Sequence, residues 1–105
     1  MVGSPASSAT GGELKDIPSG YSLSQNYPNP FNPATTIRYA LPERSHVVLS
    51  VYTILGERVA ELVNRTEGEG VHEIRFDATS LSSGVYVYLL RAGRFFQSKN
   101  LIVIR

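Results

Sequence analysis

Short runs of alternating apolar and polar residues, separated by turn residues, occupy the chain from Tyr21 onward. In Thr35–Leu41 the apolar side chains of Ile37, Tyr39 and Leu41 share one face, and Thr, Arg and Ala lie between them. This alternation is typical of a β-strand with one buried face. Comparable runs predict further strands at Tyr21–Tyr27, Val47–Tyr52, Val59–Val63, Val71–Phe76, Val85–Leu90 and Phe95–Ile104. About seven strands at roughly ten-residue spacing predict an all-β protein, an antiparallel β-sandwich.

Turn residues and one tyrosine support the sandwich. Gly56 would supply the positive φ of a tight turn, and Asn64–Gly70 is predicted to be a polar loop. Leu81–Tyr86 resembles the corner of immunoglobulin-like domains, where a tyrosine hydroxyl bonds back to the loop. Val85–Leu90 is apolar on both faces, as expected of a central strand covered on both sides. Four residues are therefore assigned structural roles in an immunoglobulin-like sandwich: Gly56, Gly70, Gly84 and Tyr86.

The first 20 residues have a different character from the rest. Ser4–Gly20 is rich in Ser, Gly, Ala and Pro, and such a segment buries too little apolar surface to offset the entropy of ordering it. Met1–Ser4 has neither the charged nor the apolar region of a signal peptide. We therefore expect a flexible linker at residues 1–20 and a folded domain at 21–105, appended to a larger protein.

Composition removes several classes of function. Ten Lys and Arg residues against nine Asp and Glu give a formal charge of +1, with no basic block for nucleic acid. The absence of cysteine excludes disulfides and thiolate sites. The sequence contains no run of about 18 apolar residues that could form a transmembrane helix.

The residues that carry chemistry form no recognisable active site. His46 and His72 have no second ligand at metal-binding spacing, and a triad of His72, Asp77 and Ser80 could be drawn by chance. His72 continues an inward-facing alternation, so we interpret it as a partly buried, hydrogen-bonded core residue. A small acidic cluster could bind calcium weakly, but it lacks the ligand spacing of an EF-hand, and we interpret it as a solvated loop: Glu67, Glu69 and Glu73. We expect no catalytic residue, cofactor or metal.

Asn26–Pro33 (NYPNPFNP) stands out. Its prolines remove backbone donors, so the segment cannot lie in the middle of a sheet, and its asparagines can bond their own backbone. Phe31 is expected to anchor the segment on the end of the sandwich, with Tyr27 joining it. The segment is either a rigid loop that caps the core or a recognition loop. The remaining candidate recognition residues in it are Pro28, Asn29, Pro30, Asn32 and Pro33.

Tyr27–Pro33 followed by Ala34–Pro42 resembles the start of the C-terminal sorting domains of the type IX secretion system of Bacteroidota and related phyla. Thr53 and Phe76 are mild departures from that pattern. The chain is also similar to the immunoglobulin-like domain of flagellar hook-capping proteins. The resemblance covers residues 21–105 and continues through Val47, Leu49, Val51, Tyr52, Gly56, Val59, Leu62, Gly70–Asp77, Leu81, Ser83, Gly84, Val85, Tyr86, Lys99, Leu101 and Arg105.

The resemblance implies a non-catalytic address on an exported parent protein. The parent would reach the periplasm by a signal peptide, and the outer-membrane translocon would then recognise the folded domain. A sortase-like peptidase would cut within Ser4–Gly20. The parent would then remain at the cell surface or outside the cell. An apolar edge strand with a basic end can be read by β-augmentation. The residues expected to be read on the last strand are Lys99, Leu101, Val103 and Arg105.

Alternatives remain open at this point. The chain could be a carbohydrate-binding module of a secreted enzyme, with Tyr52 and Tyr88 as the best candidates for an exposed stacking platform. It could also be a structural spacer, or form a weak homodimer through its last strand.

Overall fold

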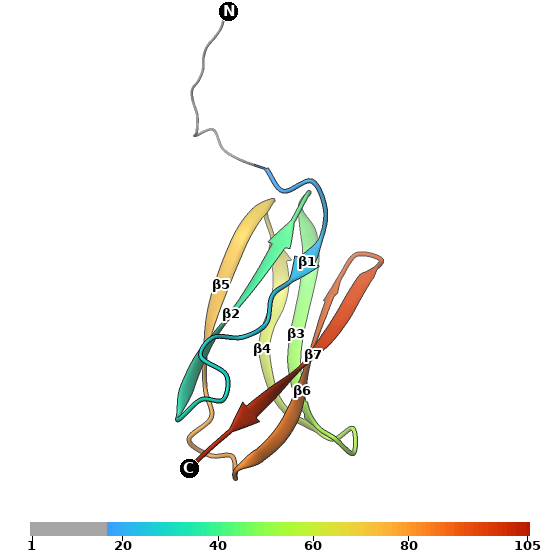
Figure 1. Ribbon diagram of the computed structural model, residues 1–105. Helices are drawn as coiled ribbons and strands as arrows, with labels where there is room; N and C mark the ends of the chain where they lie inside the picture. The colour runs from blue at the N-terminus through green and yellow to red at the C-terminus, as the bar shows by residue number, and fades with distance from the viewer. Residues whose placement is uncertain (1–16) are drawn as a thin grey trace, which may run out of the picture.

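A computed structural model describes residues 17–105, which form two antiparallel sheets (Figure 1). The all-β prediction and the number of strands are confirmed, and no helix in the described residues is long and apolar enough to cross a membrane. One sheet has the order β1-β2-β5 and the other β4-β3-β6-β7. The strands are β1 (Ser22–Leu23), β2 (Ala34–Leu41), β3 (Ser45–Thr53), β4 (Arg58–Glu67), β5 (Gly70–Asp77), β6 (Gly84–Ala92) and β7 (Phe95–Val103).

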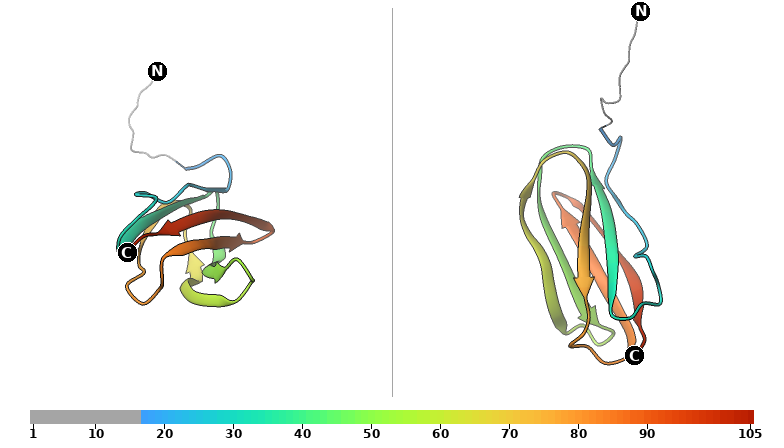
Figure 2. Two further views of the ribbon diagram at one scale, coloured as in Figure 1. Left: turned by 60° about the horizontal axis from the view of Figure 1, so that its bottom comes forward. Right: turned by 90° about the vertical axis from the view of Figure 1, so that its left-hand side faces the viewer.

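The hydrophobic core lies between the two sheets. The right-hand view of Figure 2 shows the sheet of β2 and β5 lying over the larger sheet. Ile37, Tyr39 and Leu41 of β2 are buried, which confirms the inward face predicted from the alternation of this segment. The opposite sheet contributes every second residue of β3 and β6. Its buried side chains include Val47, Leu49, Val51, Tyr86, Tyr88, Leu90, Leu101 and Val103.

Two predicted element boundaries were wrong. β4 continues to Glu67, so the predicted polar loop Asn64–Gly70 is reduced to Gly68 and Glu69. β4 is an edge strand whose last residues pair with β3, and polar side chains tolerate such a position because much of it faces water. The first strand is only Ser22–Leu23, because the continuous pairing with β2 is interrupted after it; Tyr27 returns to β2 only as an isolated bridge to Thr36.

The outer face of β6 also differs from its prediction. β6 is central in its sheet, but Val85 is exposed, and Val87 and Leu89 are only half-buried. Only the face toward the other sheet is covered, because no element among residues 17–105 lies over the opposite face. The continuous apolar run therefore leaves apolar side chains at the surface.

The predicted corner and turn are confirmed. The Tyr86 hydroxyl donates a hydrogen bond to the carbonyl oxygen of Ser82 at 2.8 Å, which ties the start of β6 to the preceding corner. Gly56 has φ of 92°, in the turn closed by a 2.8 Å bond from the Thr53 N–H to the Glu57 carbonyl. A side chain at that φ would be strained. Gly70 and Gly84 begin β5 and β6.

Candidate functional site

The proline loop (Asn26–Pro33) is fastened to the end of β7 by backbone bonds. The Phe31 N–H donates to the Ile102 carbonyl, and the Ile104 N–H donates to the Phe31 carbonyl, both at 3.0 Å. The Asn29 side-chain oxygen accepts from the Ile102 N–H at 2.9 Å. The Phe31 side chain is 1% exposed and lies 6.2 Å from the ring of Phe76, so its predicted role as an anchor is confirmed.

Buried polar groups hold the inner side of this loop. Asn26 is buried and donates from Nδ2 to the Pro28 carbonyl and to the Thr35 hydroxyl, and the Thr35 hydroxyl donates to the same carbonyl. The N–H of Asn26 donates to the Tyr88 hydroxyl at 2.8 Å, and that hydroxyl donates to the Ser24 carbonyl at 2.6 Å. These bonds supply the partners that a loop with three prolines lacks. The X-Pro bonds at Pro28, Pro30 and Pro33 are cis.

Tyr88 is fully buried, so it cannot belong to the exposed aromatic platform that the carbohydrate-binding alternative requires. Burial raises the pKa of its hydroxyl to about 12, and the Asn26 N–H offsets part of that rise. A raised pKa means that the folded protein keeps a proton that the unfolded chain loses above pH 10. Stability is therefore expected to fall between pH 10 and 12, by up to about 1.4 kcal/mol per pH unit.

This fall can be measured by determining the free energy of unfolding in urea at several pH values between 9 and about 11.5. In Tyr88→Phe, the free energy of unfolding is expected to fall less steeply with pH. Some slope will remain in Tyr88→Phe, because burial and the neighbouring Glu67 carboxylate also raise the pKa of Tyr39. If the free energy of unfolding fell equally steeply with pH in both proteins, the fall could not be attributed to Tyr88.

Tyr27 points away from the protein. Its backbone is fixed by two bonds with Thr36, each 3.0 Å long, but its side chain is 81% exposed. The expectation that Tyr27 anchors the loop beside Phe31 was therefore wrong. Residues alternate across this bridge, and because Asn26 faces the interior, its neighbour Tyr27 faces water.

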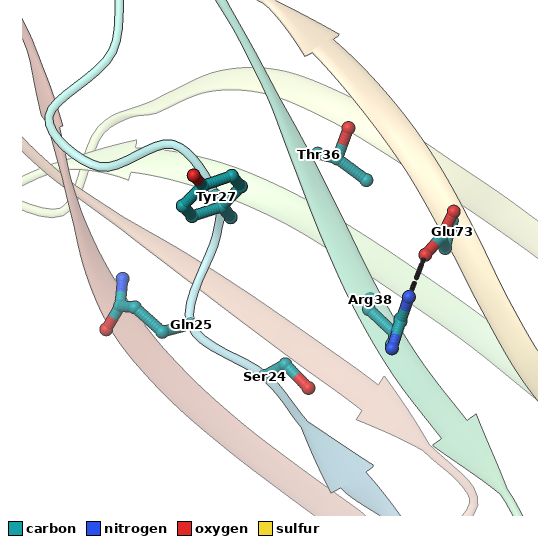
Figure 3. A pocket seen from close by; sticks show the side chains of 6 residues that line it. All are labelled: Ser24, Gln25, Tyr27, Thr36, Arg38 and Glu73. Atoms are coloured by element: carbon teal, nitrogen blue, oxygen red, sulfur yellow. Dashed lines mark hydrogen bonds and ion pairs between the residues drawn. The ribbon is translucent and has the colours of Figure 1, made fainter.

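A hollow of about 420 Å³ lies beside Tyr27 (Figure 3). Arg38 of β2 and Glu73 of β5 lie opposite each other in the sheet and form an ion pair of 2.5 Å on one side of it. Gln25 lies on the other side and donates to the Asn100 carbonyl of β7 at 2.7 Å. The hollow thus combines an exposed aromatic ring with charged and amide groups.

The recognition residues predicted on the last strand have mixed surroundings. Leu101 and Val103 are core side chains, Lys99 is half-buried, and Arg105 donates from its guanidinium to the carbonyls of Ala78 and Thr79. The fold therefore brings the proline loop and the end of β7 together, as Figure 1 shows at the lower left. The other loop residues predicted for recognition are exposed or half-exposed: Pro28, Asn29, Pro30, Asn32 and Pro33.

Sequence reasoning missed several residues around the loop, namely Gln25, Thr35, Arg38 and Glu73. The outward positions of Arg38 and Glu73 in their strands were a signal, but the pairing of β2 with β5 was not known.

The interpretation of Glu67, Glu69 and Glu73 as one solvated loop was wrong for two of the three residues. Glu67 is the last residue of β4 and Glu73 lies on β5, so only Glu69 belongs to the connection between these strands.

His72 and Asp77 each form contacts within the fold. The His72 ring stacks on Tyr39 with 5.4 Å between ring centroids, and its Nε2 lies 2.8 Å from the Gly68 carbonyl, as expected of a hydrogen-bonded, partly buried residue. The Asp77 carboxylate accepts from the N–H and hydroxyl of Thr79, which lowers its pKa. Within residues 17–105, no three His, Asp or Glu residues cluster closely enough to hold a metal.

The site is thus a proline loop bonded to one end of a small β-sandwich, with one aromatic side chain facing water. Residues 25–104 match the family described as the secretion system C-terminal sorting domain, and the chain belongs to this family. Membership implies a C-terminal sorting signal for type IX secretion, carried by a larger parent protein exported across the outer membrane to the surface or beyond. The family consists of signal domains and not of enzymes. No curated protein matches the chain.

Proposed function

We propose that this domain is read in its folded form by the outer-membrane translocon, and that Tyr27 with its neighbouring hollow is a surface that the translocon contacts. The observation that carries this proposal is the 81% exposure of Tyr27 on a backbone held by Thr36. Asn26, Asn29 and Phe31 each stabilise the fold, whereas the Tyr27 ring contributes little to it. A large, preorganised aromatic ring loses little entropy when a partner covers it.

The rest of the route follows from the same proposal. The parent reaches the periplasm through its own signal peptide, and a sortase-like peptidase removes the domain after export. The cut falls within Ser4–Gly20, most of which lies outside the described residues. Ile17–Gly20, the described part, contains no strand and is mainly exposed, as a protease substrate must be.

Replacing Tyr27 by Ala tests the proposal. A reporter fused before the domain and expressed in a bacterium with a type IX system is expected to lose secretion by about tenfold or more, the size of effect at an interface hot spot. The midpoint of thermal unfolding of the purified domain should change by less than about 4 °C, because the ring is exposed.

Two variants serve as controls. Tyr27→Phe retains the ring and should be secreted, and Val71→Ala removes an exposed side chain from β5 and should be secreted normally. Normal secretion of Tyr27→Ala would count against Tyr27 as a contact. Failure of the unaltered domain to export the reporter would reject the function itself.

A further inference from the structure

Residues 17–105 cover only half of the outer edge of β7. From Asn100 onward, three of its outward backbone groups have partners in residues 25–31: the Asn100 carbonyl accepts from Gln25, the Ile102 N–H donates to Asn29, and the Ile102 carbonyl accepts from Phe31. These bonds show that the backbone groups of even-numbered residues in β7 point away from β6. A new strand cannot pair here without displacing the proline loop.

The described residues leave the other half of this edge open. The pairing of β7 with β6 has no register shift from Phe95 to Val103, so the alternation of an antiparallel ladder turns the backbone groups of Phe96 and Ser98 outward as well. No residue among 17–105 forms a hydrogen bond to those groups. Unpaired backbone donors and acceptors on an edge strand are a template for another strand.

An apolar hollow of about 480 Å³ adjoins the open half on the outer face of the sheet. Its lining includes Tyr52, Ile54, Val87 and Leu89 and ends at Ser98 on the edge strand, with no carboxylate or cationic side chain. Ser98 is small, so the hollow is accessible from the edge. Phe96, on the same face of β7, is 71% exposed.

We propose that the Phe96–Ser98 edge of β7 pairs with an extended strand of a separate protein, which places an apolar side chain over Ser98 in this hollow. The inference rests on the proposed function and identifies a second contact for the secretion machinery. The open backbone groups specify an extended partner, and the lining specifies an apolar side chain. Gln25 lies at the end of the open edge and also lines the hollow beside Tyr27, so one partner can contact both surfaces.

A second copy of the chain fits this edge less well. Two copies paired through β7 would share only the short Phe96–Ser98 ladder. Such a contact is small beside the roughly 1,000 Å² expected of a specific interface. A partner strand of a larger protein can add contacts beyond β7.

Two substitutions at Ser98 test the proposal in the reporter assay. Ser98→Pro removes the outward N–H but no bond to β6, and proline is tolerated at such edge positions. Ser98→Arg leaves the backbone unchanged and places a charged side chain over the apolar hollow. Both are expected to reduce secretion by about tenfold or more, the effect of losing a central contact. Ser98→Thr, the matched control, should be secreted normally.

The outcomes separate the proposals. If the unaltered domain exports the reporter and both Ser98→Pro and Ser98→Arg do so equally well, the open edge is not a contact and the sorting function stands. If the unaltered domain fails to export, the function fails first. Thermal unfolding shows whether each variant folds, and Ser98→Arg alone decides if Ser98→Pro does not. A dimer of the purified chain that Ser98→Arg dissociates, with secretion of Ser98→Arg intact, would assign the edge to a second copy instead.

Discussion

Deleting Asn100–Arg105 is expected to unfold the domain. The deletion removes Leu101 and Val103, both of which are fully or almost fully buried, and it removes the backbone partners of Phe31. Truncating a single buried aliphatic side chain costs about 2–5 kcal/mol, and the total stability of a small domain is about 5–15 kcal/mol. The truncated chain should therefore show no cooperative thermal transition by circular dichroism.

This expectation affects how a secretion defect of that deletion is interpreted. Loss of secretion by the truncated chain would reflect loss of the fold as much as loss of a recognition residue. Lys99→Ala and Arg105→Ala are the matched controls, because these side chains lie outside the core. The first should change stability by about 0.5 kcal/mol or less. The second also loses the bonds to the carbonyls of Ala78 and Thr79 and should cost about 1–2 kcal/mol, which leaves the domain folded. A truncated chain that still unfolds cooperatively would show that the end of β7 is dispensable for folding.

Replacing Phe31 by Ala is the second substitution with a large expected effect. The ring is almost completely buried against Phe76, and removing such a side chain costs about 3–5 kcal/mol. The loss is expected because the proline loop has no other large apolar side chain in the core. Urea unfolding measures it as a lower midpoint with an unchanged slope.

Hydrogen exchange gives a second measurement on Phe31→Ala. The amide of Ile104 donates to the Phe31 carbonyl, so its protection should fall more than that of amides in β3. Phe96→Ala is the matched control, since its ring is largely exposed and its loss should change stability by about 0.5 kcal/mol or less. Equal stability losses in the two variants would contradict the anchoring role of Phe31.

The strands could be predicted from the sequence because alternation is a local property. The spacing of Ile37, Tyr39 and Leu41 predicts which face of their strand is buried, and this prediction needs no knowledge of any other segment. Arg38 and Glu73 could not be paired in the same way, because their contact depends on the register between β2 and β5. Similarly, β4 was predicted too short because polar residues on an edge strand resemble a loop.

The two aromatic residues of the proline loop illustrate the same limit at the candidate site. Phe31 and Tyr27 have similar apolar surface, and both precede or follow a proline. Their opposite exposures are set by which partner holds each backbone, Ile102 in one case and Thr36 in the other. Those partners lie on different sheets, and only the assembled fold distinguishes the anchor from the exposed residue.

The attachment of the proline loop to β7 has a consequence for synthesis. Asn29 and Ile102 are separated by 73 positions, and Gln25 and Asn100 by 75, so nearly the whole domain must be made before these contacts can form. Contacts between distant residues also slow folding, because a long loop must close first. A ribosome that stops before β7 would release a parent without a folded address. Coupled to the proposed function, this arrangement would act as a test of completeness, in which only parents translated to their end acquire the surface that the secretion machinery reads.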